Sequence, residues 1–247
     1  MKYPRFGMFV AALALSPSLV SLAQNGHSHA KSHAVDKDDW VLGAPYSAER
    51  RFTSVSIGAD GKTTTTESGG SEARDSRGRT YSDGERQWLY QGEMRSEMLY
   101  RIEDPVTKTE TKWDSTTKEA RVLHFPPNAA KGNNPDSPCP AACRDFKMND
   151  FGDEVVKLGA KVIEGVLAEG TRSSYTVAIG EDHNDRPIVV VHETWYCPEL
   201  EIVVLETNDD PRSGQTRNQV VNIVRGEPDV ARYLPPADYI VHDVQVH

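Results

Sequence analysis

The chain has 247 residues, of which 37% are hydrophobic and 26% charged, and its formal net charge at pH 7 is -9. This length suffices for one large domain or two small ones, and the many β-branched and aromatic residues argue against a fully disordered protein. The acidic balance, without a basic patch, argues against nucleic acid and against an anionic membrane surface as partners.

The N-terminus has the pattern of an export signal. Lys2 and Arg5 precede the short apolar run Gly7–Leu15, and Ser21-Leu22-Ala23 has small residues at the positions that signal peptidase reads. This order of a positive region, an apolar region and a small-residue cleavage site is typical of a secretory signal peptide. We expect residues 1–23 to be cleaved off, which leaves a periplasmic or extracellular protein that does not span the membrane. The alternative is an uncleaved anchor, although a membrane span takes roughly 20 apolar residues.

The next segments change from polar to strand-like. Residues 24–39 are polar and rich in histidine, without a periodic apolar pattern, and they predict a flexible leader. From Trp40 onward, short runs rich in Thr, Val, Ile, Tyr and Trp alternate with turn residues, as in antiparallel strands joined by hairpins. Asp60-Gly61 predicts a tight turn between strands at Phe52–Ile57 and Thr63–Glu67.

A short motif then occurs twice. Asp104–Lys108 (DPVTK) and Asp114–Lys118 (DSTTK) each follow an apolar or aromatic stretch. Asp side chains in such positions hydrogen-bond to the backbone of their own turn, so the two copies predict successive hairpins of a meander. Residues 125–150 differ, because closely spaced prolines remove ladder donors and predict a long surface loop.

The second half predicts the strongest strands. They are Val166–Ile179, Ile188–Tyr196, Leu200–Thr207, Thr216–Arg225 and, after a short helical turn through Tyr233, Tyr239–Val244. In Ile188–Val191 and Ile202–Leu205 both strand faces are apolar, which implies that both faces are covered. We therefore expect loops, a helix or a bound apolar ligand over the inner face of the sheet. Residues 40–247 are expected to form a single β-rich domain with few short helices.

Several residues of the C-terminal half follow the order seen in a known superfamily. They are Lys161–Gly165 (KVIEG), Trp195–Leu200 (WYCPEL), Asn222-Ile223 and Pro235–Tyr239 (PPADY). Residues 155–244 resemble the lipoprotein-localisation superfamily, which includes outer-membrane lipoprotein carriers and the sensor domains of periplasmic anti-sigma regulators. The resemblance implies a mainly β fold with a curved antiparallel sheet, an unclosed barrel, whose concave face binds an acyl chain or part of a lipoprotein. The Asp75–Thr80 stretch (DSRGRT) also resembles a group of exported bacterial proteins of unassigned function.

The disulfide candidates are Cys139, Cys143 and Cys197. Exported proteins meet an oxidising compartment, where disulfides persist. Cys139 and Cys143 could pair with each other within the loop, or either could pair with Cys197, and one thiol is left over in every case. A structural zinc site would need two further ligands, and redox motifs have a different spacing, so a loop staple is the expectation.

No group of residues has the spacing of a catalytic, metal or cofactor site. The histidines within residues 24–39 could chelate a metal, but that segment offers no preformed geometry. His192 and Glu193 are strand neighbours that point to opposite faces, so His192 is expected to be a cross-strand partner. Ser173 lacks the Gly-x-Ser-x-Gly motif of many hydrolases. We expect no catalytic residue, no metal and no cofactor.

The favoured hypothesis is a non-enzymatic exported binding protein. Its apolar concave sheet face would hold a lipid, an acyl chain or a lipoprotein segment. The expected contact residues are Trp195, Val190, Val204 and Tyr175. The alternative is an envelope protein-interaction or structural module without an internal ligand. A third hypothesis is a hydrolase with dispersed catalytic residues, which a cleft joining His192 or His183 to a carboxylate and a serine would favour.

Overall fold

The computed structural model describes residues 40–58, 60–124 and 154–245. The expected signal peptide at residues 1–23 and the expected leader at residues 24–39 lie outside this part. The expected loop at residues 125–150, with Cys139 and Cys143, also lies outside the described residues.

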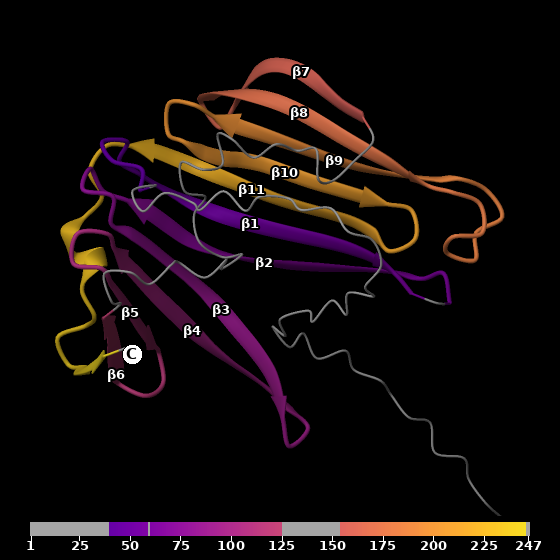
Figure 1. Cartoon of the computed structure of the whole chain (residues 1–247). Coiled ribbons are helices and arrows are strands. Elements are labelled where there is room, and N and C mark those ends of the chain that lie inside the picture. The colour runs from indigo at the N-terminus through magenta and orange to yellow at the C-terminus, as the bar shows by residue number, and fades with distance from the viewer. Residues whose placement is uncertain (1–39, 59, 125–153, 246–247) are drawn as a thin grey trace, which may run out of the picture.

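Twelve strands form one sheet in the order β12-β6-β5-β4-β3-β2-β1-β11-β10-β9-β8-β7 (Figure 1). The elements are β1 (Tyr46–Ile57), β2 (Thr63–Arg74), β3 (Thr80–Tyr90), β4 (Glu93–Asp104), β5 (Thr109–Asp114), β6 (Glu119–His124), β7 (Glu154–Ile163), β8 (Val166–Val177), β9 (Ile188–Cys197), β10 (Ile202–Asp210), β11 (Gly214–Arg225), the 3₁₀ turn η3 (Val230–Tyr233) and β12 (Ile240–Gln245). The expected mainly β fold with few short helices is confirmed.

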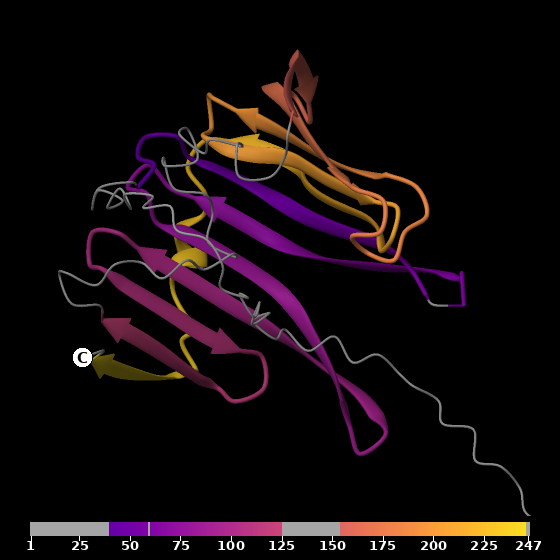
Figure 2. The same cartoon turned by 45° about the vertical axis from the view of Figure 1, so that its right-hand side comes forward.

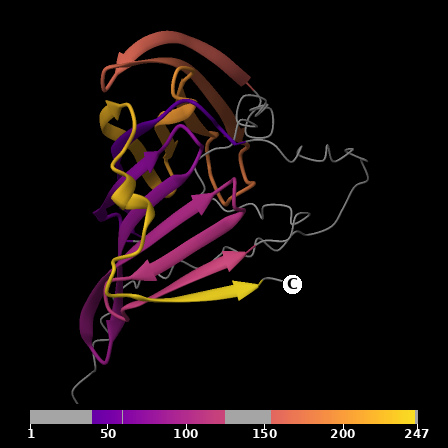
Figure 3. The ribbon, with the colours of Figure 1, turned by 90° about the vertical axis from the view of Figure 1, so that its left-hand side faces the viewer.

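The sheet is curved but not closed, as the resemblance implied. In Figure 3 the strands at both ends of the sheet, β7 and β8 at one end and β6 and β12 at the other, extend to the same side of its middle. The edge strands β7 and β12 do not pair with each other. One pairing differs from the expected antiparallel pattern, because β12 runs parallel to β6. It does so because the segment after β11 crosses back over the sheet before β12 begins.

The pairing of β2 with β3 divides the sheet into two parts. Only three residue pairs join these strands, Glu72–Ser82, Ala73–Tyr81 and Arg74–Thr80, whereas β1 and β2 are paired along their whole length. Beyond the three pairs the strands diverge (Figure 2). We call β3–β6 with β12 the small half, and β1, β2 and β7–β11 the large half.

The point of divergence depends on a glycine. A Cβ atom at Gly70 would collide with the carbonyl oxygen of Asp83. Beside it, the Ser71 backbone N–H donates to Asp83 Oδ1 at 2.7 Å. A side-chain acceptor thus satisfies a strand donor where the ladder between β2 and β3 has ended.

Each half has its own apolar cluster. The cluster of the large half includes Val166, Trp195, Val204 and Val220. The cluster of the small half consists of Ala73, Tyr81, Ile102, Trp113, Ala120 and Tyr233, with Tyr100 and Tyr239 packed against it. Because Tyr233 comes from η3, the segment between β11 and β12 completes the core of the small half.

The repeated Asp motif forms two similar turns, as expected. Asp104 Oδ1 accepts the backbone N–H groups of Val106 and Thr107, at 2.8 and 3.1 Å. Asp114 Oδ1 accepts those of the corresponding residues Thr116 and Thr117, at 2.7 and 2.8 Å. These turns join β4 to β5 and β5 to β6, so the predicted meander is confirmed.

The Asp75–Thr80 stretch is the turn between β2 and β3. Asp75 is 4% exposed, and its Oδ1 accepts the backbone N–H groups of Arg77 and Arg79 at 3.0 and 2.8 Å. Arg79 Nε donates to Asp75 Oδ2 at 2.6 Å. The Arg79 guanidinium carbon lies 4.5 Å from the ring centroid of Tyr233. The turn therefore holds η3 against the sheet through Arg79.

Candidate functional site

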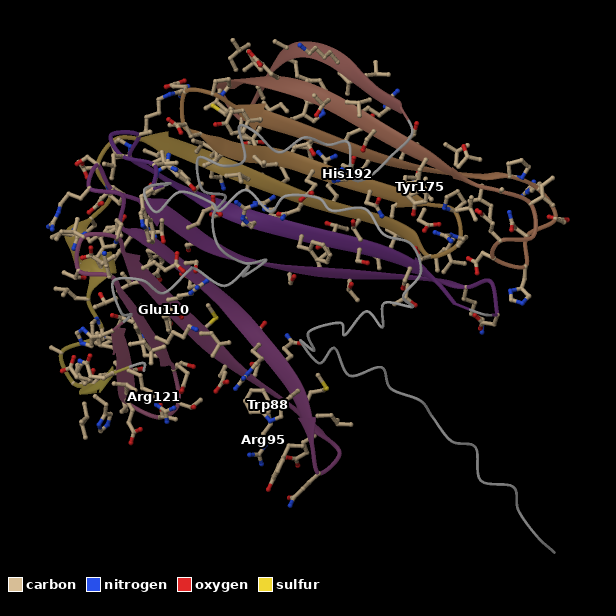
Figure 4. The ribbon with its side chains drawn as sticks, in the orientation of Figure 1. Trp88, Arg95, Glu110, Arg121, Tyr175 and His192 are labelled. Atoms are coloured by element: carbon tan, nitrogen blue, oxygen red, sulfur yellow. The ribbon has the colours of Figure 1, made fainter. Side chains whose placement is uncertain are left out.

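The four expected contact residues do not form one site. Val190 of β9 is directly paired with Tyr175 of β8, and both belong to the concave face (Figure 4). Trp195 is five residues beyond Val190, so the alternation of the strand turns its side chain to the convex face. Val204 is fully buried in the core of the large half, in the same apolar cluster as Trp195. The structure therefore brings together Val190 with Tyr175, and Trp195 with Val204, in two separate places.

Trp195 packs against a glycine in the neighbouring strand. It is paired with Gly170 of β8, and a Cβ atom at Gly170 would lie 2.6 Å from the indole ring. Lys161 of β7 also contacts the ring, because its Nζ lies 3.6 Å from the centroid of the Trp195 ring. The ring is buried between these two residues, so its observed role is packing.

Replacing Gly170 with valine should destabilise the protein by about 1–3 kcal/mol, because the added methyl groups displace the Trp195 ring from a packed site. Urea unfolding followed by circular dichroism measures this loss. Gly84→Val is the matched control, since a Cβ atom there has only one neighbour within 4 Å, at 3.9 Å. Equal unfolding midpoints for the two variants would contradict the packing role of Gly170.

On the large half, the concave face carries a hydrogen-bonded polar group of residues. Arg50 Nε donates to Glu72 Oε2 at 2.6 Å, and Tyr46 Oη donates to Glu72 Oε1 at 2.9 Å. His192 Nε2 and Glu206 Oε1 are 2.9 Å apart. The hydrogen bond with His192, together with the positive charge of Arg50, lowers the pKa of Glu206. His192 is thus a cross-strand partner, as expected.

The concave face of the small half is charged as well. The buried carboxylates of Glu97, Glu103 and Glu110 each form an ion pair with a basic residue of this face. Trp88, Arg95, Glu110 and Arg121 lie on this part of the face (Figure 4). The concave face is therefore not the apolar surface that the sequence predicted. The two strands that are apolar on both faces contribute to this surface, but β1–β6 add Arg and Glu side chains to it.

A serine, a histidine and a carboxylate do meet on the concave face. Ser173 is directly paired with His192, which is bonded to Glu206. Ser173 is only 1% exposed, however, and within the described part of the chain its Oγ has no hydrogen-bond partner. A serine nucleophile needs a hydrogen bond to its base and access for the substrate. The observed arrangement provides neither, so it does not favour the hydrolase hypothesis.

No three His, Cys, Asp or Glu side chains within residues 40–58, 60–124 and 154–245 could hold a metal ion together. Cys197 is a buried free thiol there. Its two candidate partners, Cys139 and Cys143, lie outside the described residues.

The convex face of the small half contains a pocket, which we call the aromatic pocket. Its volume is about 440 Å³. The sheet contributes Tyr81, Tyr100 and Trp113, and the segment 231–239 contributes Arg232, Leu234, two prolines, two alanines and Tyr239. Tyr100 and Trp113 are directly paired on β4 and β5, and their rings stack with centroids 5.2 Å apart and planes at 8°. The pocket thus has a flat aromatic wall on the sheet side.

The segment that covers the aromatic pocket is capped at its start and bonded to the sheet at its end. At the start of η3, Asp229 Oδ1 accepts the backbone N–H of Ala231 at 2.9 Å. At the other end, Tyr239 Oη donates to the backbone oxygen of Asp114 at 3.0 Å. Lys118 Nζ forms an ion pair with Asp238 at 2.6 Å. The two prolines between these ends fix their own φ angles, so the segment holds its shape over the sheet.

The polar groups around the aromatic pocket are mostly occupied. Tyr81 Oη donates to Asp83 Oδ2 at 2.7 Å, and burial together with this hydrogen bond raises the pKa of Tyr81 well above its usual value. The guanidinium carbon of Arg232 lies 5.7 Å from the ring centroid of Tyr81. The sequence reasoning did not predict this pocket. The sequence does contain aromatic and proline residues that can line a pocket, at Trp113 and Pro235–Tyr239. The local sequence around them, however, does not indicate that these two segments lie together in the fold.

No known protein family and no curated protein matches the sequence. Several solved structures do match, and those described below share no more than 11% of identical residues with this chain.

Three matches illustrate the likeness. The MucA/MucB complex of Pseudomonas aeruginosa matches with 10% identity and a TM-score of 0.34, over 81% of this chain and 59% of that chain. LprF from Mycobacterium bovis matches with 9% identity and a TM-score of 0.32, over 75% and 88% of the two chains. The lipoprotein LppX of Mycobacterium tuberculosis matches with 11% identity and a TM-score of 0.29, over 76% and 88%. The chain therefore spans about three-fifths of the matched MucA/MucB chain.

Within the described residues, no helix has both the length and the apolar character needed to cross a bilayer.

Proposed function

We propose that this protein is a non-enzymatic binding protein of the cell envelope and that the aromatic pocket is its ligand site. The observation that carries this proposal is the cavity of about 440 Å³ between Tyr81, Tyr100, Trp113 and the segment 231–239. Small-molecule sites are typically concave, mostly apolar and roughly 300–1,000 Å³ in volume, with a few polar groups that orient the ligand. The aromatic pocket has a volume in this range and an aromatic wall, and it is an open depression rather than an enclosed cavity.

An apolar ligand, such as an acyl chain or an aromatic compound, fits the aromatic pocket better than the concave face. Against Tyr100 and Trp113 it would gain roughly 25 cal/mol for each Å² of apolar surface removed from water. On the concave face it would have to cover charged groups such as Glu110 and Arg50, which costs desolvation free energy. We therefore keep the apolar ligand that the sequence suggested and move its site to the convex face. The export signal supports an envelope location for this activity.

Filling the mouth of the aromatic pocket should abolish binding. We expect the neutral fluorescent probe 1-aminoanthracene to bind the wild-type protein, and Ala237→Trp to weaken that binding by about tenfold or more, which corresponds to about 1.4 kcal/mol. Ala237 lines the pocket and is exposed, so the added ring can occupy the cavity without disturbing a core. Fluorescence titration gives both dissociation constants.

Ala178→Trp is the matched control, because Ala178 is an exposed alanine in the turn after β8. This variant should bind the probe like the wild type. Absence of probe binding to the wild type, or equal binding by the two tryptophan variants, would refute the proposed site.

A protein partner at the sheet edge is a second candidate function. All six residues of β12 are exposed, and three of them are the apolar Ile240, Val241 and Val244. An exposed edge strand can pair with a strand of another chain, and its side chains then give specificity. This interaction would leave the aromatic pocket open, so Ala237→Trp would not affect it.

A further inference from the structure

Three basic residues of this region lie over aromatic rings, namely Arg79 over Tyr233, Lys118 over Tyr239 and Arg232 over Tyr81, and the first two form ion pairs with carboxylates. Arg79 pairs with Asp75 at 2.6 Å, and Lys118 pairs with Asp238 at 2.6 Å. Arg232 lines the pocket and is exposed, and no carboxylate of the described residues forms an ion pair with it. The pocket therefore has one basic group whose charge is not matched by the described part of the chain.

Two carboxylates of the neighbouring elements already have other partners. Asp83 accepts hydrogen bonds from the Ser71 backbone N–H and from Tyr81 Oη. Asp229 accepts the backbone N–H of Ala231, which caps η3. The contact that positions Arg232 is the one with the Tyr81 ring, at 5.7 Å from its centroid. No described residue accepts a hydrogen bond from the Arg232 guanidinium, so its five N–H donors remain for a ligand.

We infer that the ligand of the aromatic pocket is an amphiphilic anion and that Arg232 binds its carboxylate. The inference rests on the proposed function, because the same pocket must first accept the apolar part of the ligand. The apolar part would lie against Tyr100 and Trp113, and the charged head would lie at the mouth. A guanidinium binds a carboxylate through two parallel hydrogen bonds, a geometry that a neutral hydroxyl head cannot use.

Displacement of bound 1-aminoanthracene by two ten-carbon compounds tests the inference. Decanoate carries a carboxylate, and decan-1-ol carries a neutral hydroxyl group on the same chain. Since decan-1-ol is the more hydrophobic compound, burial alone would favour it. We expect decanoate to displace the probe from the wild-type protein at about tenfold lower concentration than decan-1-ol does. Acetate, which has the carboxylate without the alkyl chain, should displace no probe.

The Arg232 variants show which residue gives the preference. Arg232→Gln should lose the preference for decanoate while still binding the neutral probe, and Arg232→Lys should retain much of it. Arg95→Gln is the matched control, because it removes the same charge from an exposed position on the concave face and should behave like the wild type.

The outcomes separate this inference from the proposed function. Equal displacement by decanoate and decan-1-ol in the wild type overturns the inference and leaves the apolar site intact. An undiminished decanoate preference in Arg232→Gln also overturns it, because another group must then bind the carboxylate. Failure of the wild type to bind the neutral probe refutes the proposed function, and the inference with it.

Discussion

Replacing Asp75 with alanine should lower the free energy of unfolding by about 3–5 kcal/mol, the usual loss when one member of a buried ion pair is removed. Asp75 is buried, accepts two backbone N–H groups of its own turn, and pairs with Arg79. Without the carboxylate, these donors lose their acceptor and Arg79 is left partly buried without a counter-charge. The contact of Arg79 with Tyr233 should weaken too, so η3 should separate from the sheet and the aromatic pocket should lose affinity for 1-aminoanthracene.

Urea unfolding, followed by circular dichroism, measures the stability change of Asp75→Ala. Asp104→Ala is the matched control, since Asp104 caps a turn of the same kind with two backbone hydrogen bonds but has no ion pair among the described residues. We expect the control to lose only about 1 kcal/mol, the usual cost of removing one capping side chain. A loss of the same size in both variants would show that the Asp75–Arg79 pair contributes little.

Arg74→Ala should be the next most damaging change, with a loss of about 2–4 kcal/mol from unsatisfied acceptors and lost packing. Arg74 is 3% exposed, and burial lowers its pKa. Its guanidinium donates to the backbone oxygens of Ala44 and Leu200, and it lies over the ring of Tyr46. It therefore joins the segment before β1 to the turn between β9 and β10.

The same urea experiment, extended to Arg74→Lys and Arg77→Ala, tests this role. Lysine keeps the charge but lacks the planar guanidinium that donates to both carbonyl oxygens. The stability of Arg74→Lys should therefore lie between those of the wild type and Arg74→Ala. Arg77 is exposed in the adjacent turn, and its removal should change the stability by less than about 0.5 kcal/mol. If Arg74→Ala were as stable as Arg77→Ala, the proposed tie between the two segments would be wrong.

The sequence predicted those parts of the fold that depend on local hydrogen bonds. The turns at Asp104 and Asp114 were recognisable because an Asp side chain caps its own turn, whatever lies around it. The parallel pairing of β12 with β6 could not be predicted in this way. It depends on where the chain crosses the sheet after β11, and no residue near β12 carries that information.

The candidate site was predicted less well than the fold. The separation of Trp195 from Val190 follows from the period of two in a strand, and the sequence reasoning could have found it. The charged concave face and the aromatic pocket are different, because each needs side chains from strands that are distant in the sequence. Trp113 and Tyr239, for example, share a pocket only because β12 returns to β6.

The pairing of β1 with β11 has a consequence for the kinetics of folding. These strands are paired along most of their length, although they lie near opposite ends of the described chain. The chain must close a very long loop before this pairing can form, and the entropy of loop closure makes such sheets slow to fold. The meander of β3–β6 needs no such closure, because each strand pairs with the next one in the chain. The meander of β3–β6 can therefore assemble early, while β12 must wait for the end of the chain and the large half must wait for β11 to reach β1.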